Sequence, residues 1–248
     1  MTLLLTNQTS LAPSRRQFLT AAPTALAMWP CAQLAHADVT GAANPLLAAY
    51  DDMMTRFLRE HKPPGAALAV TYHGRLVYAR GFGHADLEKQ QPVQPASLFR
   101  IASVSKPFTA TAVLHLVEKG KLKLADRVLP ILKLEPHLER GRRLDPRWHD
   151  IQVHQCLQHT GGWDRDKSLD PMGAETAENV AKALKVRLPI HPKQIIRYMM
   201  GKPLDFAPGT AYAYSNFGYC VLGRVIEAVT RKPYEEFVSR EILAPLGI

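Results

Sequence analysis

Ser103 and Lys106 are spaced so that the lysine could act as the base for a serine nucleophile. The sequence around them, residues 98–110, predicts an extended stretch that turns into a helix. Side chains three residues apart share a helix face, so we expect the hydroxyl and the amine to meet. A serine attacks a carbonyl when a base takes its proton, and a lysine whose pKa is lowered by burial or a neighbouring positive charge can be that base. Ser105 adjoins the lysine and points elsewhere, so Ser103 is the predicted nucleophile.

Tyr214 and Asn216 form a second polar pair, in the order Y-x-N. Pro208-Gly209 indicates a turn, and a helical pattern begins at about Asn216. The loop before a helix is a place from which a phenol and a carboxamide can project into a cleft. Tyr212 is the competing tyrosine, but only Tyr214 has an asparagine two residues further on. Each pair also has a purely structural interpretation, a serine-capped helix start for the first and a capped turn for the second.

Together, these segments resemble the serine β-lactamase and penicillin-binding protein superfamily, specifically its class C-like branch, which also holds D-amino peptidases and esterases. The likeness runs from about Pro64 to the C-terminus. It includes further segments at residues 64–67, 78–83, 157–162 and 243–247. At Gly161 the family more often has serine.

The resemblance implies acyl transfer through an acyl-enzyme. It assigns four roles: Ser103 is the acylated nucleophile, Lys106 its base partner, Tyr214 the carrier of the proton to and from the leaving group, and Asn216 a ligand of the substrate carbonyl. The Ser103 backbone N–H, at the positive end of its helix, would hold the oxyanion. The expected substrate is a small molecule or peptide of β-lactam, D-amino peptide or ester type, with the cell wall as a candidate source, and no cofactor is needed. The alternative is a non-catalytic exported binding or sensor module of the same fold, or an inactive fragment.

Hydrophobic patterning predicts an α/β fold, in which an antiparallel sheet is flanked by helices and accompanied by an all-helical region. Two apolar runs, residues 66–72 and 75–82, are joined by His73-Gly74, which is typical of a tight β-hairpin. The first run is apolar at nearly every position, so we expect helices to cover both of its faces.

Several helices are predicted as well. One begins at Asn44-Pro45, with asparagine as N-cap and proline at the first position, and its apolar stripe includes Phe57. The helix after Ser103 has Leu114 in its apolar set and stops at Gly120. Further helices are expected at residues 153–159, 174–186, 192–200, 216–230 and 233–243, with a polar loop at 163–173.

The predicted sheet lacks partners. An isolated two-stranded hairpin is marginally stable in water, and its edges invite pairing. In the family, further strands follow Y-x-N, and one of them carries K-T-G or H-x-G. No such motif follows Asn216, and His159-Thr160-Gly161 precedes Tyr214. We therefore expect residues 38–248 to be a hydrolase domain that lacks its C-terminal strands.

The composition is that of a globular protein with a basic surface. Of the 248 residues, 46% are hydrophobic and 21% are charged, and the formal net charge is +9. The lysines and arginines are scattered, without a basic run or an aromatic-interleaved patch, which argues against a nucleic-acid partner.

Residues 1–37 are predicted to be a targeting segment. Arg15-Arg16 precedes an apolar stretch, and Ala35-His36-Ala37 provides a cleavage site before Asp38, in the order of a twin-arginine export signal. The apolar stretch is too short and too interrupted by proline for a stable membrane span. The expected location is therefore periplasmic or secreted.

The remaining candidate ligands give weaker signals. His149, His154 and His159 are five residues apart and share no helix face, so no metal site is expected. Cys156 and Cys220 lie in apolar helical patterns and are interpreted as buried thiols, with a disulfide as the alternative that an oxidising compartment would permit. No G-x-S-x-G motif is present, which argues against an α/β-hydrolase.

Overall fold

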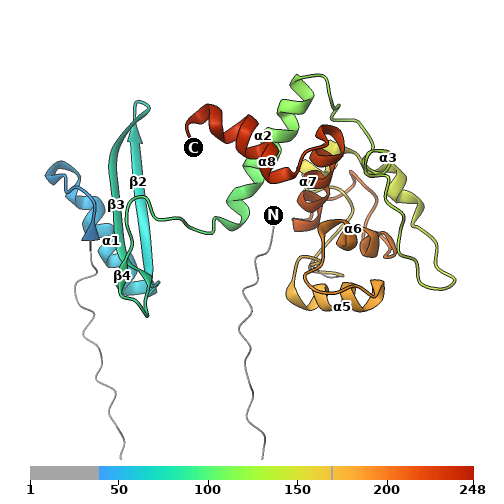
Figure 1. Ribbon diagram of the computed structural model, residues 1–248, viewed down its shortest axis with the longest axis horizontal. Helices are drawn as coiled ribbons and strands as arrows, with labels where there is room; N and C mark the ends of the chain where they lie inside the picture. The colour runs from blue at the N-terminus through green and yellow to red at the C-terminus, as the bar shows by residue number, and fades with distance from the viewer. Residues whose placement is uncertain (1–38, 169) are drawn as a thin grey trace, which may run out of the picture. The chain divides into compact units, whose positions relative to one another are not determined.

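A computed structural model of the protein describes residues 39–168 and 170–248. The predicted export signal, residues 1–37, lies outside the described residues. The chain divides into two compact units, whose described parts are residues 39–100 and residues 101–248 apart from Leu169. The first unit contains the sheet, and the second is helical (Figure 1). The predicted α/β class, with a small antiparallel sheet and a helical region, is confirmed.

The sheet unit is a hairpin with one helix packed on it. Its elements are β1 (Val39–Thr40), α1 (Ala48–His61), β2 (Gly65–Tyr72), β3 (Arg75–Asp86) and β4 (Gln91–Pro92). β2 and β3 pair antiparallel, and the short β1 and β4 both pair with β3. The turn between β2 and β3 has a positive φ at both His73 and Gly74, 48° and 73°, so the predicted tight hairpin is confirmed.

Within the described residues of the sheet unit, helix α1 covers one face of β2, whereas the sequence predicts helices on both faces. Alternate β2 residues, among them Leu68 and Val70, pack towards α1, whereas those between them are exposed. In this unit's described residues, α1 is the only long helix, so the period-two alternation leaves the other face open. Phe57 is also 44% exposed, although it was expected in the buried stripe of α1.

The helix start at Asn44 is confirmed in part. The Asn44 side chain accepts a hydrogen bond from the Leu46 N–H at 3.1 Å, as expected of an N-cap. The first turn, Pro45–Leu47, is a 3₁₀ helix, and α1 itself begins at Ala48.

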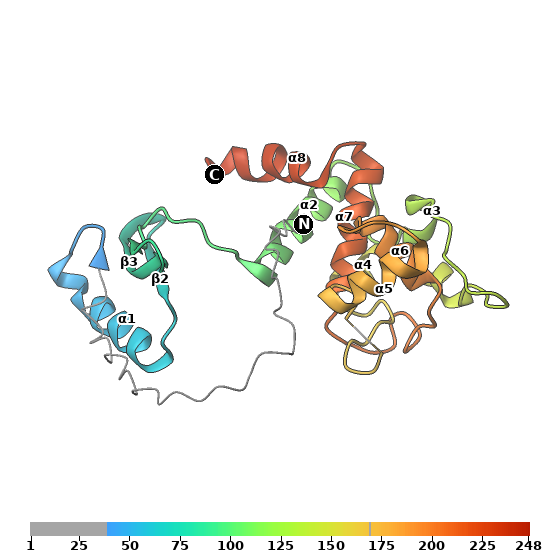
Figure 2. The ribbon, with the colours of Figure 1, turned by 60° about the horizontal axis from the view of Figure 1, so that its bottom comes forward.

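The helical unit packs around α7. Its elements are a 3₁₀ turn (Ala102–Val104), α2 (Ser105–Glu118), α3 (Val128–Leu132), a 3₁₀ turn (Pro146–Asp150), α4 (Val153–Leu157), α5 (Ala174–Leu184), α6 (Pro192–Met200), α7 (Asn216–Thr230) and α8 (Tyr234–Val238), which continues through Ser239–Leu243 and Ala244–Leu246. Helices α2, α3, α4, α6 and α8 all contact α7 (Figure 2). The predicted ranges of α6 and α7 coincide with those observed. In α2, Leu114 is 50% exposed, and Val113 and Leu116 face the core instead.

The N-terminus of α7 is held by a cap and by aromatic packing. Ser215 is the N-cap, and its Oγ accepts a hydrogen bond from the Gly218 N–H at 3.1 Å. At the second residue of α7, the Phe217 ring meets the Trp163 ring edge to face with ring centres 4.8 Å apart, and the Trp148 ring centre lies 5.4 Å from that of Trp163. All three aromatic side chains are buried, so this cluster fixes the end of α7 that carries Asn216.

The two cysteines of the helical unit lie within its helices α4 and α7. Cys156 is buried, Cys220 is partly buried, and both are free. Burial raises the pKa of the Cys156 thiol to about 12 and that of Cys220 to about 11, so neither is a ready nucleophile. No helix within residues 39–168 and 170–248 has the length and apolar character needed to cross a membrane.

Candidate active site

Ser103 and Lys106 meet at the start of α2. Ser103 lies in the 3₁₀ turn that leads into the helix, and Lys106 is the second residue of α2. Lys106 Nζ donates to Ser103 Oγ at 3.2 Å. Ala102, just before the serine, has a φ of 43°, a conformation that is uncommon for a residue other than glycine.

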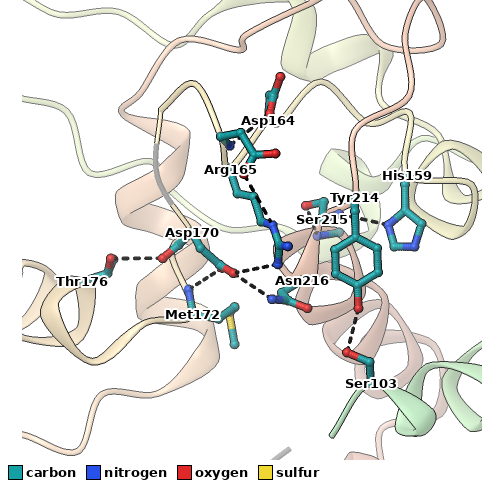
Figure 3. A network of polar contacts seen from close by, with 12 residues as sticks. Ser103, His159, Asp164, Arg165, Asp170, Met172, Thr176, Tyr214, Ser215 and Asn216 are labelled. Atoms are coloured by element: carbon teal, nitrogen blue, oxygen red, sulfur yellow. Dashed lines mark hydrogen bonds and ion pairs between the residues drawn. The ribbon is translucent and has the colours of Figure 1, made fainter.

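Tyr214, which lies just before α7, contacts the same pair. Its hydroxyl donates to Ser103 Oγ at 2.7 Å (Figure 3). The same hydroxyl accepts from Lys106 Nζ at 2.6 Å. Tyr212 is 69% exposed and forms no such contact. The structure therefore places Tyr214, rather than Tyr212, beside the serine.

Asn216 completes the contacts of Lys106. Its Oδ1 accepts from Lys106 Nζ at 2.8 Å, and its Nδ2 donates to Asp170 Oδ2 at 2.7 Å. An ionised carboxylate only accepts, so Asp170 sets which end of the amide faces the lysine. The lysine ammonium then has an acceptor for each of its three protons, in Ser103, Tyr214 and Asn216.

The charges around Tyr214 favour its ionised form. Burial of the phenol opposes ionisation, but hydrogen bonds with Lys106 and Ser103, and the positive charges of Lys106 and Arg165, leave the pKa of Tyr214 below its ordinary value. The Arg165 guanidinium lies 5.1 Å from the centre of the Tyr214 ring. A phenol with a lowered pKa, in contact with a serine hydroxyl, can take and return a proton.

Three neighbours of this group were not predicted as part of the site from the sequence. His159 packs against the Tyr214 ring, Asp170 bonds to Asn216, and Arg165 lies over Tyr214 and 3.9 Å from Asp170. The sequence pattern marks His159 as one of three evenly spaced histidines and as part of His159-Thr160-Gly161, in a loop that carries part of the family resemblance. Asp170 and Arg165 lie in the polar loop before α5, and no local pattern marks them.

The loop after His159 explains where this chain departs from the family pattern. A Cβ on Gly161 would lie 2.5 Å from the Trp163 ring, which is buried in the aromatic cluster. Serine at this position would therefore require the tryptophan to move. Gly162 has a φ of 109°, a backbone conformation that residues other than glycine rarely adopt.

The described residues contain no cluster of three His, Cys, Asp or Glu side chains that could hold a metal ion. His154 Nδ1 lies 3.1 Å from the Leu124 carbonyl oxygen, whereas His149 is exposed. The three histidines that were considered in the sequence thus have separate surroundings. The polar groups that do gather are those around Ser103.

Comparisons with known proteins show the family to which the chain belongs. Residues 50–248 match the family model described as Beta-lactamase. The esterase EstB of Burkholderia gladioli is 34% identical over 211 residues, which are 83% of this chain and 51% of that protein. The octameric penicillin-binding protein homologue from Pyrococcus abyssi superposes with a TM-score of 0.65 at 30% identity, over 81% of this chain and 43% of that one.

A mutant class C β-lactamase superposes with a TM-score of 0.62 at 25% identity, over 82% of this chain and 49% of that one. The chain spans about half the length of EstB and of these structures. The family model nevertheless covers most of the chain, including the segments that carry Ser103, Lys106, Tyr214 and Asn216. This chain belongs to the β-lactamase family of hydrolases.

Proposed function

We propose that the protein is a serine hydrolase that acts through an acyl-enzyme formed on Ser103. The observation that carries the proposal is the three-way contact among Ser103 Oγ, Lys106 Nζ and the Tyr214 hydroxyl, with separations of 2.6 to 3.2 Å. A nucleophile within hydrogen-bond reach of its base is the arrangement that acyl transfer requires.

In the first half-reaction, Ser103 Oγ bonds to the substrate carbonyl carbon, and its proton passes to the Tyr214–Lys106 pair. The tetrahedral intermediate collapses, the bond to the leaving group breaks, and Tyr214 returns the proton to that group. Water then attacks the acyl-enzyme, and the same pair accepts the water's proton. The bond between Ser103 Oγ and the acyl carbon then breaks, and the pair returns the proton to Oγ, which releases the acid and restores the Ser103 hydroxyl. The Ser103 N–H, near the positive end of α2, is the proposed oxyanion donor.

The substrate we propose is an ester. The basis is the similarity to the esterase EstB, which is 34% identical over 83% of this chain and 51% of EstB. β-Lactams and D-amino peptides are the alternatives, since a class C β-lactamase and a penicillin-binding protein homologue share the fold. Comparing hydrolysis of p-nitrophenyl butyrate with that of nitrocefin and of a D-alanyl peptide would distinguish them.

Covalent labelling tests the nucleophile. The protein expressed from its complete reading frame should react with a fluorophosphonate probe, and peptide mapping should locate the adduct on Ser103. Ser103→Ala should abolish labelling, because removal of a catalytic nucleophile costs on the order of 10⁶ in kcat. Ser105→Ala is the matched control and should be labelled like the wild type. Label retained in Ser103→Ala would refute the assignment.

A further inference from the structure

His159 holds the main chain on both sides of Tyr214. Its carbonyl oxygen accepts from the Ala213 N–H at 3.0 Å, and its ring Nδ1 accepts from the Ser215 N–H at 3.1 Å. Tyr214 lies between these two donors, and its hydroxyl is 2.7 Å from Ser103 Oγ (Figure 3). One residue therefore fixes the backbone from which the phenol projects.

The His159 ring also packs in the site. Its centre lies 4.7 Å from that of the Tyr214 ring, at an interplanar angle of 32°, and 5.2 Å from that of Tyr219. Tyr212 meets it edge-on at 5.9 Å. The groups that face His159 are thus three tyrosines and the Lys106 ammonium, whose charge acts on the ring.

The bond from Ser215 defines the protonation state of the ring. A main-chain N–H can only donate, so Nδ1 must carry a lone pair, and the ring must be neutral with its proton on Nε2. If Nδ1 also carried a proton, the Nδ1–H and the Ser215 N–H would both be donors and the hydrogen bond would be lost. Burial, followed by the positive charge of Lys106, holds the pKa of His159 below its ordinary value.

From this geometry we propose that His159 is a positioning residue for Tyr214, and that protonation of its ring releases the Ser215 N–H and switches off acylation of Ser103 at acidic pH. The effect on acylation rests on the proposed serine-hydrolase function, whereas the hydrogen bond between the Ser215 N–H and His159 Nδ1 does not depend on it. His159 touches neither Ser103 nor the reacting carbonyl in this scheme. It acts through the placement of the phenol, and a displacement of about 1 Å in such a group can cost roughly 10²-fold in rate.

The expected signature is a second ionisation in the acylation profile. Loss of the basic form of the Tyr214–Lys106 pair lowers the rate by about tenfold per pH unit as pH falls. Protonation of His159 adds a further decrease, whose midpoint lies below the ordinary histidine pKa of about 6.5 because the shift is downward. In a plot of the logarithm of the labelling rate against pH, the slope should therefore increase from one to two at acidic pH.

Two substitutions separate the acceptor from the ring. His159→Asn can present Oδ1 near the position of Nδ1 and does not titrate. It should label within about tenfold of the wild type at pH 8, with no steepening at acidic pH. His159→Phe keeps a ring against Tyr214 but has no acceptor, and should label about 10²-fold more slowly at every pH. His149→Asn, at an exposed histidine of the same unit, is the control and should keep the wild-type profile.

A readout that does not depend on activity completes the test. The amide resonance of Ser215, followed by ¹⁵N–¹H NMR, should shift with the titration of His159 in the wild type and stay constant in His159→Asn. A Ser215 resonance that is constant from pH 8 to 5, or unchanged steepening in His159→Asn, would overturn the proposal. Absence of labelling in the wild type would instead refute the proposed function, and the Ser215 titration would still decide whether His159 holds the loop.

Discussion

At the scale of single residues, Lys106 organises the candidate site. Its ammonium donates to the serine, to the phenol of Tyr214 and to the amide of Asn216, all within 3.2 Å. Only the serine contact is local, since Tyr214 is 108 residues away along the chain. Removing the phenol hydroxyl therefore breaks the contacts of Tyr214 with Ser103 and Lys106, whereas Asn216 still joins the two segments through Lys106.

Tyr214→Phe should reduce the rate of Ser103 acylation by about 10²- to 10⁴-fold, the usual contribution of a positioned acid–base group. The phenylalanine ring still packs on His159, so the fold should be retained. Because the pKa of Tyr214 is lowered, the wild-type rate should rise with pH with a midpoint below pH 10, and this rise should disappear in the variant. Stopped-flow labelling from pH 6 to 10 measures both effects.

Tyr212→Phe is the matched control, since that side chain is largely exposed and has no contact with Ser103. Its rate and pH profile should equal those of the wild type. If Tyr214→Phe were acylated as fast as the wild type, Lys106 alone would be the base.

At the scale of elements, Asp145 ties the turn Pro146–Asp150 to the chain after α6. Its side chain accepts from the Arg147 main chain at 3.0 Å, from the Arg147 guanidinium at 2.6 Å and from the Leu204 N–H at 3.0 Å. The same turn carries Trp148 into the aromatic cluster that supports α7. A change at Asp145 is therefore expected to affect the scaffold of the site.

Asp145→Asn should lower the free energy of unfolding by about 1–2 kcal/mol at pH 7, because charge-assisted bonds to Arg147 are lost. The hydrogen bond from Arg147, more than any other contact, lowers the pKa of Asp145 to about 2. The stabilisation is therefore complete above the unfolded-state pKa of about 4 and is lost as pH falls towards 2. Urea unfolding of the wild type and the variant should converge over that range.

Asp150→Asn is the control for this experiment. Its carboxylate is 64% exposed and lies 3.5 Å from Arg127, and exposed pairs contribute little, roughly 0–1 kcal/mol. A pH-independent difference between Asp145→Asn and the wild type would contradict the role of the ionised carboxylate.

At the scale of the whole molecule, the helical unit by itself assembles all four predicted site residues. Ser103, Lys106, Tyr214 and Asn216 all belong to residues 101–248. The core of this unit is continuous from α2 to α8, with α7 at its centre. The sheet unit has a separate small core between α1 and the hairpin.

We propose that the whole protein is exported through a twin-arginine signal. Replacing Arg15 and Arg16 by lysine should leave the protein in the cytoplasm, because the paired arginines are the feature that the export receptor reads. Cell fractionation and N-terminal sequencing measure this, with a mature start near Asp38 expected for the wild type. The same exchange at Arg142 and Arg143, both exposed, is the control and should not change export. Unchanged secretion after the first exchange would refute the proposal.

The sequence by itself was sufficient for features that depend on nearby residues. The contact between Ser103 and Lys106 follows from one turn of helix, the β2–β3 hairpin from His73-Gly74, and the bounds of α6 and α7 from their periodic patterns and caps. These depend on local geometry and propensity, which the order of residues specifies directly.

Only the tertiary structure decided which distant groups meet. His159 holds Ser215 across 56 residues, and Asp170 orients Asn216 across 46. The exposure of Phe57 and Leu114, and of one face of β2, likewise depends on which elements pack there. Periodicity predicts that a face is apolar, but the path of the chain determines what covers it and which donor finds which acceptor. For this reason, the contact between Ser103 and Lys106 could be predicted from the sequence, whereas the groups that hold Tyr214 and Asn216 could not.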